Sequence, residues 1–68
     1  MTEYVTTRAF PAELAGRVDN LIPRCCRSVR MSHEDDGTCT LTAHRSEIAA
    51  ARRAIRIARD EAATAHIR

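Results

Sequence analysis

The sequence predicts a single small α+β domain, spanning residues 1–68, with the element order β-α-β-β-α. Two patterns carry this prediction. Residues 46–68 repeat apolar side chains at alternating steps of three and four, which places them on one face of a helix. Residues 38–44 alternate between polar and apolar side chains, as a half-buried strand does. A chain of this length makes one domain and buries a limited fraction of its surface.

The first strand is predicted over residues 3–9, which are rich in β-forming residues. The pattern leaves open which of its faces is buried. One face carries Val5, Thr7 and Ala9, and the other carries Tyr4, Thr6 and Arg8. Pro11 suits the first turn of a helix that runs to Leu21 or Ile22 and ends before Pro23. The apolar face of this helix consists of Leu14, Val18 and Leu21.

Two further strands, over residues 28–34 and 38–44, form a predicted hairpin. A two-residue turn would place apolar residues of one strand opposite polar residues of the other. A three-residue loop that ends at Gly37 sets Met31 opposite Leu41, so that the apolar faces agree. We therefore expect the second register, which leaves a polar outer face. That face consists of Ser28, Arg30, Ser32, Thr40, Thr42 and His44.

One long helix is predicted over residues 46–68, with Ser46 as its N-cap and Glu47 in its first turn. Its apolar face consists of Ile48, Ala51, Ile55, Ala58, Ala62 and Ala65. Ile57 points away from this face, in the direction of Ala50 and Ala54. We expect an exposed Ile57 that suits contact with another helix, and an isolated surface apolar residue is the alternative.

The predicted sheet is antiparallel with strand order 2-3-1, and both helices cover one face. It is a ferredoxin-like unit that lacks its last strand. Because the missing strand would pair with the first strand, the first strand offers an open edge, with no proline or lysine to discourage pairing. A homodimer, formed through this edge or through the long helix, or a partner's strand would use this opening. The alternative is a short edge that faces water.

Composition sets limits on the environment of the protein. Three cysteines, two of them adjacent, do not suit a disulfide framework, so we expect a cytoplasmic protein. No apolar run is long enough to span a membrane, and no signal peptide precedes the first charged residues. We expect a complete small gene product that does not act at a membrane.

Metal and catalytic sites receive little support from the sequence. The candidate ligands are Cys25, Cys26, Cys39, His33, His44 and His66. No two of them follow a zinc-ligand spacing, although the hairpin register places His33 opposite Cys39 on the inner face. No nucleophile motif or cofactor motif is present. The acidic residues 34–36 lie on a turn, where charged side chains are usually only solvated. We therefore expect no metal, no cofactor and no enzymatic activity.

Arginines carry the strongest functional signal. The net charge is only +2, but all eleven basic residues are arginine. Two explanations fit this composition: GC-rich coding bias, or bidentate recognition of carboxylate or phosphate groups, which arginine performs better than lysine. The arginines form two groups, one in residues 24–30 and one in residues 52–59. No acid interrupts the first group, and in the second only Arg56 has an acid, Asp60, at a spacing that allows an ion pair on a helix. With Ile57, the candidate partner-binding residues are Arg24, Arg27, Arg30, Arg52, Arg53, Arg56 and Arg59. Low net charge, few aromatics and no RNA-binding motif argue against nucleic acid. A solvated helix face is the alternative.

Three short stretches carry a resemblance to a known family. They are Phe10-Pro11, the turn over residues 34–37 and the alanine-rich segment over residues 48–55. In these stretches the chain resembles the small dimerising subunit of the KEOPS tRNA-modification complex, with which it shares a strand-helix-hairpin-helix order over most of its length. Most matched positions are alanine or another apolar residue, so no functional residue is carried over.

The expected function is non-enzymatic docking on a larger protein or ribonucleoprotein complex, as an inhibitor or adaptor. The size suits a phage-encoded inhibitor of bacterial defence, of the anti-CRISPR kind. The expected mechanism is steric: the arginines, with an exposed helix or strand edge, would occupy a site on the partner. The alternative is a nucleic-acid-binding module in which the same arginines contact phosphates, and steep salt dependence would favour it.

Overall fold

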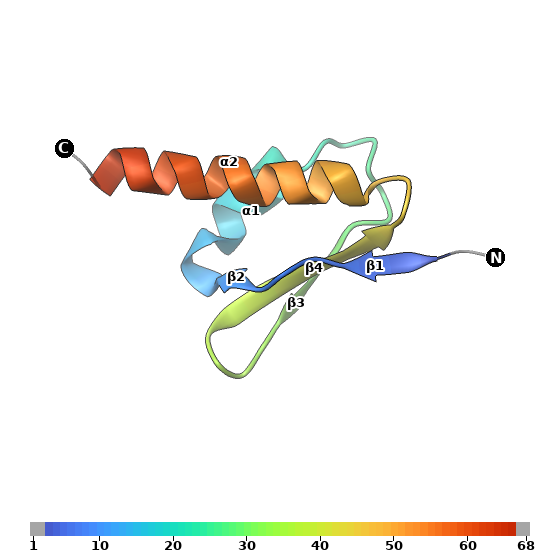
Figure 1. The fold of residues 1–68 in the computed structure, drawn as a ribbon, viewed down its shortest axis with the longest axis horizontal. Coiled ribbons are helices and arrows are strands. Elements are labelled where there is room, and N and C mark those ends of the chain that lie inside the picture. The colour runs from blue at the N-terminus through green and yellow to red at the C-terminus, as the bar shows by residue number, and fades with distance from the viewer. Residues whose placement is uncertain (1–2, 67–68) are drawn as a thin grey trace.

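The computed structural model describes residues 3–66, which form a sheet covered on one face by two helices (Figure 1). The elements in chain order are β1 (Tyr4–Thr6), β2 (Phe10–Pro11), a 3₁₀ turn η1 (Ala12–Leu14), α1 (Ala15–Leu21), β3 (Arg30–His33), β4 (Thr38–His44) and α2 (Ile48–His66). The predicted α+β class is confirmed. The predicted count of three strands is wrong, because residues 3–66 form a sheet of four.

Strand β4 lies at the centre of the sheet and pairs antiparallel with each of the other strands. Residues 39–42 of β4 pair with β3, residues 42–44 pair with β1, and residues 38–39 pair with β2. Thr42 and Cys39 therefore each have a partner on both sides. A strand has only two edges, so β1 and β2 lie one after the other along the opposite edge from β3. The Thr38–His44 strand is therefore central, as predicted from the sequence.

A β-bulge divides the predicted first strand into β1 and β2. Thr7 donates its N–H to the carbonyl of Leu41 at 2.8 Å, and Phe10 pairs with Cys39. Two residues, Arg8 and Ala9, therefore lie opposite Thr40 alone, which is the definition of a bulge. The extra residue shifts the alternation, so that Phe10 is buried. Ala9, which the pattern grouped with Val5 and Thr7, is exposed.

The hairpin adopts the predicted register. Met31 pairs with Leu41, and Glu34 donates its N–H to the carbonyl of Thr38 at 2.9 Å. Gly37 has φ 83°, the left-handed conformation that a three-residue loop of this kind requires. Strand β3 begins at Arg30 rather than at Ser28, because Ser28 binds the start of α2 instead of joining the outer face.

The helix starts differ from the prediction. Pro11 lies in β2, with ψ 136°, and the chain enters α1 through the 3₁₀ turn. The N–H groups of Ala50 and Ala51 bond to the carbonyl of Glu47, so Glu47 takes the N-cap position expected for Ser46. The Ser46 hydroxyl instead lies 2.8 Å from Nδ1 of His44.

The core lies between the sheet and the two helices, and α1 packs against α2. Its buried members are Phe10, Leu14, Val18, Cys39, Leu41, Ala43, Ile48, Ala51, Ala54, Ile55 and Ala58. Ala54, expected on the outer side of α2, is 1% exposed, because the helix is covered by both the sheet and α1. At the far end of α2, Ala62 is half-buried and Ala65 is exposed, so the predicted apolar face is covered only up to its last turns.

Candidate functional site

Most arginines in the described part of the chain have no acidic partner. Within residues 3–66 there are two ion pairs, Arg17–Glu61 at 3.5 Å and Arg45–Glu3 at 3.6 Å. The pair expected between Arg56 and Asp60 is not formed there. The arginines without an ion pair in this range are Arg8, Arg24, Arg27, Arg30, Arg52, Arg53, Arg56 and Arg59, all of them exposed.

Four of these arginines line one groove between the β1–β2 edge and α2. The groove has a volume of about 440 Å³. Its lining consists of Thr6, Thr7, Arg8, Arg52, Ile55, Arg56 and Arg59. None of these residues is acidic, and arginines from two separate elements line the same space. We call this feature the arginine groove.

The elements of the fold position each arginine for a simple reason. Arg52, Arg56 and Arg59 follow steps of four and three, which place them along one flank of α2. Arg8 belongs to the β-bulge, a feature that commonly re-aims a side chain at a sheet edge. One nitrogen of Arg59, Nη2, donates to the carbonyl of Ala9 at 3.2 Å and so links α2 to the bulge.

The wall beneath the arginines is fixed by hydrogen bonds and by burial. The hydroxyl of the buried Thr7 accepts the N–H of Leu41 at 3.0 Å and donates to the carbonyl of Arg8 at 3.1 Å. The hydroxyls of Thr6 and Thr42 lie 3.0 Å apart. Ile55, which is 9% exposed, supplies the apolar part of the wall. The ligand-binding capacity of the groove therefore belongs mainly to its guanidinium groups.

This arrangement suits an anion with several negative groups. Each guanidinium presents five N–H donors in a fork that fits carboxylate or phosphate oxygens. Like charges one helical turn apart, such as Arg52 and Arg56, are mildly destabilising without a counter-charge. A bound anion would relieve this repulsion. The lining holds no cysteine, histidine or acid that would act as nucleophile or general base.

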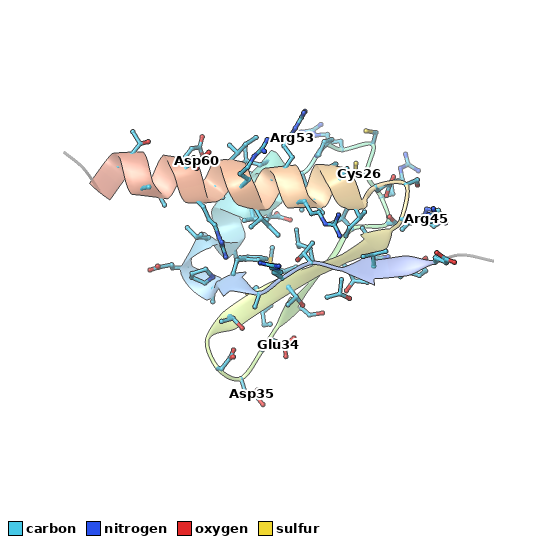
Figure 2. All side chains as sticks on the ribbon, viewed as in Figure 1. Cys26, Glu34, Asp35, Arg45, Arg53 and Asp60 are labelled. Atoms are coloured by element: carbon cyan, nitrogen blue, oxygen red, sulfur yellow. The ribbon has the colours of Figure 1, made fainter. Side chains whose placement is uncertain are left out.

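The remaining predicted arginines lie elsewhere. Arg53 points away from the sheet, as Figure 2 shows, and lines a hollow of about 430 Å³ with Pro23 and Ala49. It also lines a smaller hollow, of about 290 Å³, with Arg52 and Arg56. Arg24 and Arg27 lie in the loop before β3. Arg30 pairs with Thr42 and is exposed, in agreement with its predicted place on the outer face. Three of the four members of the predicted helical group therefore line the arginine groove, and Arg53 adjoins two of them outside it.

Ile57 differs from its prediction. It is half-buried rather than exposed, and it lines a hollow of about 640 Å³ beside α1. That hollow also includes Arg17, Asp60 and Glu61, so charges of both signs surround it. Ile57 therefore does not belong to a continuous apolar surface with Ala54, which is buried.

Arg8 is the groove residue that the sequence prediction missed. Strict alternation from residue 3 assigns Arg8 to the same face as Thr6, and the sequence shows no glycine or proline at the bulge itself. The register shift that defines the bulge depends on how Phe10 packs against β4, which is a tertiary contact. The available sequence signal was that strict alternation would place the apolar Phe10 on the same face as the polar Thr6 and Arg8.

Two acids outside the arginine groove, one at the start of α2 and one in the β3–β4 turn, already accept hydrogen bonds. The carboxylate of Glu47 accepts hydrogen bonds from the hydroxyl and the backbone N–H of Ser28, which lower its pKa. Asp36 accepts two hydrogen bonds from Thr38, at 2.6 and 3.1 Å, which lower the pKa of Asp36 in the same way. Neither acid lines the arginine groove, so neither supplies the groove arginines with an acidic partner.

The Cys26 thiol is not an activated one. Desolvation raises the pKa of the Cys26 thiol, and the neighbouring Cys25 side chain raises it further, which disfavours the reactive thiolate. The Sγ of the buried Cys39 lies 3.2 Å from Nδ1 of His33, as their predicted pairing implies. Within the described residues, no three histidine, cysteine or acidic side chains gather closely enough to hold a metal ion.

Comparison of the chain with protein-family models, with curated proteins and with solved structures finds no match. The resemblance to the KEOPS subunit therefore stays a prediction. Neither helix in the described part of the chain has the length and apolar character needed to cross a bilayer.

Proposed function

We propose that this protein is a non-enzymatic, cytoplasmic binding protein that docks on a larger macromolecular complex as an inhibitor or adaptor. The observation that supports the proposal is the arginine groove, which four arginines from two elements line without an acid. Such a groove would recognise an acidic surface and would cover it sterically. A phage-encoded inhibitor of bacterial defence, of the anti-CRISPR kind, is the form of this function that the small size favours.

The arginine groove gives the proposal a sharp test. The double variant Arg52→Glu/Arg56→Glu reverses two groove charges, and Arg24→Glu/Arg27→Glu makes the same charge change on the loop before β3. Partners captured by the wild-type protein are identified, purified and recombined with each variant at moderate salt. We expect a stoichiometric complex whose affinity falls at least about tenfold in the groove variant, as loss of charge-assisted hydrogen bonds implies. Equal binding by both variants would contradict the proposal.

Nucleic acid is the second candidate ligand. It is favoured by one observation: a groove of guanidinium groups without carboxylates suits phosphates as well as acidic side chains. The mass of the protein in solution, measured with short DNA and RNA at low and at moderate salt, tests this candidate. A nucleic-acid complex that moderate salt abolishes would replace protein docking with phosphate binding. No complex at either salt concentration would remove the second candidate.

A further inference from the structure

The arginine groove lies directly beside a sheet edge that has no partner strand within the described residues. The carbonyl of Glu3 accepts the N–H of Arg45 at 3.0 Å, and Thr7 donates to Leu41. Because backbone bonds alternate along an antiparallel strand, every second residue of β1 faces β4. Tyr4 and Thr6 lie between these positions and direct their N–H and C=O groups away from the sheet. Strand β1 therefore presents backbone donors and acceptors at the margin of the arginine groove.

The usable part of this edge ends at the bulge. The carbonyl of Ala9 already accepts a hydrogen bond from Arg59, and Pro11 has no N–H to donate. A strand that joined the sheet would therefore pair with β1 and stop near Arg8. Beyond that point, the groups that a ligand could contact are the arginine side chains of the groove and no longer the free backbone groups of β1. The edge and the groove thus form one surface in which backbone pairing and charge recognition are available together.

From these observations we infer that the arginine groove takes an extended acidic segment of a partner protein, which adds to β1 as an extra strand. The inference rests on the proposed docking function and specifies its partner. In such a pairing, the added residues opposite Val5 and Thr7 point toward α2. The residue between them points to the outer face. Recognition therefore requires aspartate or glutamate at two positions separated by a single residue.

The spacing of the charges agrees with this arrangement. Side chains two residues apart on a strand are separated by about 6.6 Å. Arg52 and Arg56, four residues apart on α2, are separated by about 6 Å along the helix axis. Two carboxylates of one strand can therefore each meet a separate guanidinium. Because the arginines stand on a helix and the backbone groups on a strand, both are held in place before the partner arrives.

A second copy of this chain fits the surface less well. On the face of its own β1 edge that would have to point toward α2, a second copy offers one acid, Glu3. That side chain is already paired with Arg45. The other positions on that face are Val5 and Thr7, which carry no charge. Edge-to-edge pairing of two copies would also bring two arginine grooves together without enough acids between them. Charge complementarity therefore favours a foreign acidic strand over a homodimer.

Two synthetic peptides of equal composition test the inference. In the first, glutamate occupies every second position among threonines and valines. In the second, the same residues are reordered so that glutamate occupies every third position, which places adjacent glutamates on opposite faces of a strand. We expect the first peptide to bind about tenfold more tightly and to shift the amide signals of Tyr4 and Thr6 in the NMR spectrum. Equal affinities would overturn the inference.

Backbone pairing is tested by proline. Thr6→Pro removes an N–H that points away from β4, and Thr6→Ala removes the same hydroxyl but keeps the N–H. We expect Thr6→Pro to bind the alternating peptide about tenfold more weakly than Thr6→Ala, as loss of an edge hydrogen bond predicts. If Thr6→Pro does not fold, Tyr4→Pro removes the other outward N–H, with Tyr4→Ala as its control. Equal binding by a folded proline variant and its control would overturn the inference.

The two proposals fail in different ways. If the charge-reversed groove variant loses its partner while Thr6→Pro keeps full affinity, docking stands and strand addition is wrong. If the protein alone has the mass of a dimer and Thr6→Pro makes it a monomer, the edge is occupied by a second copy, and the inference is overturned. Tighter binding of a short RNA than of the alternating peptide, at equal salt, would also overturn it.

Discussion

The two flanks of α2 carry similar side chains but differ in how their charges are balanced. On the flank beside α1, Glu61 lies 3.5 Å from Arg17, and the hollow there contains acids as well as an arginine. On the flank beside the sheet edge, the arginine groove contains four arginines and no acid. One helix therefore has a flank whose counter-charges come from within the chain and a flank whose counter-charges must come from solvent or a ligand.

The difference arises from what packs against each flank. Helix α1 is itself a charged surface helix, and it brings Arg17 within reach of α2. The edge strand contributes threonines and Arg8, which is a further positive charge. A flank that served only to keep the protein in solution would be expected to mix both signs, as the α1 flank does. The contrast between the flanks is what singles out the arginine groove.

The largest effect is expected where the edge strand is anchored in the core. Phe10 follows the bulge and is 1% exposed. Phe10→Ala should lower the free energy of unfolding by about 3–5 kcal/mol, because it removes a fully buried aromatic side chain and leaves a cavity. Urea denaturation measures this loss. Tyr4→Ala is the control on the same edge, since Tyr4 is 60% exposed and should change stability by less than about 1 kcal/mol. Similar losses in both variants would contradict the burial of Phe10 in the core.

The wall of the arginine groove should depend on one buried hydroxyl. Thr7→Val keeps the shape of the side chain but leaves the N–H of Leu41 without its acceptor. We expect a loss of about 1–3 kcal/mol in the free energy of unfolding, the usual effect of an unsatisfied buried donor. Thr6→Val is the matched control, because the Thr6–Thr42 hydrogen bond is exposed. A larger loss in the control than in Thr7→Val would contradict this account of the groove wall.

Sequence alone predicted the parts of the molecule that local patterns determine. The alternation in residues 38–44 and the position of Gly37 were enough to define β4 and the hairpin register. The bulge at Arg8–Ala9 and the start of α2 were not predictable in this way. The first depends on the packing of Phe10 against β4, and the second on the bond between Ser28 and Glu47. Three of the four groove arginines lie on a periodic helix and were predicted, and the fourth lies at the bulge and was missed.

The start of α2 should show a specific pH dependence. Hydrogen bonds from Ser28 hold the pKa of Glu47 below its ordinary value. A depressed pKa in the folded state contributes stability that is present above the ordinary pKa of a glutamate and is lost as pH falls through the folded value. We therefore expect stability to fall in this acidic range, and to fall less in Ser28→Ala, measured by thermal unfolding across the range. Ser46→Ala should keep the wild-type profile, because Ser46 bonds to His44 instead. Identical profiles for wild type and Ser28→Ala would contradict the assignment.

The smallest predicted effect compares the two flanks directly. Arg17→Gln removes the partner of Glu61, and because both side chains are nearly half exposed the loss should be only about 0.2–0.5 kcal/mol. Arg56→Gln removes a charge that is repelled by Arg52 one turn away, so it should leave the free energy of unfolding unchanged or raise it by about 0.2–0.5 kcal/mol. Urea denaturation at low salt measures both changes, and added salt should reduce each of them, because exposed charges are screened. If Arg56→Gln destabilised the protein as much as Arg17→Gln, the groove arginines would stabilise the fold, and their role as a binding site for an acidic ligand would be contradicted.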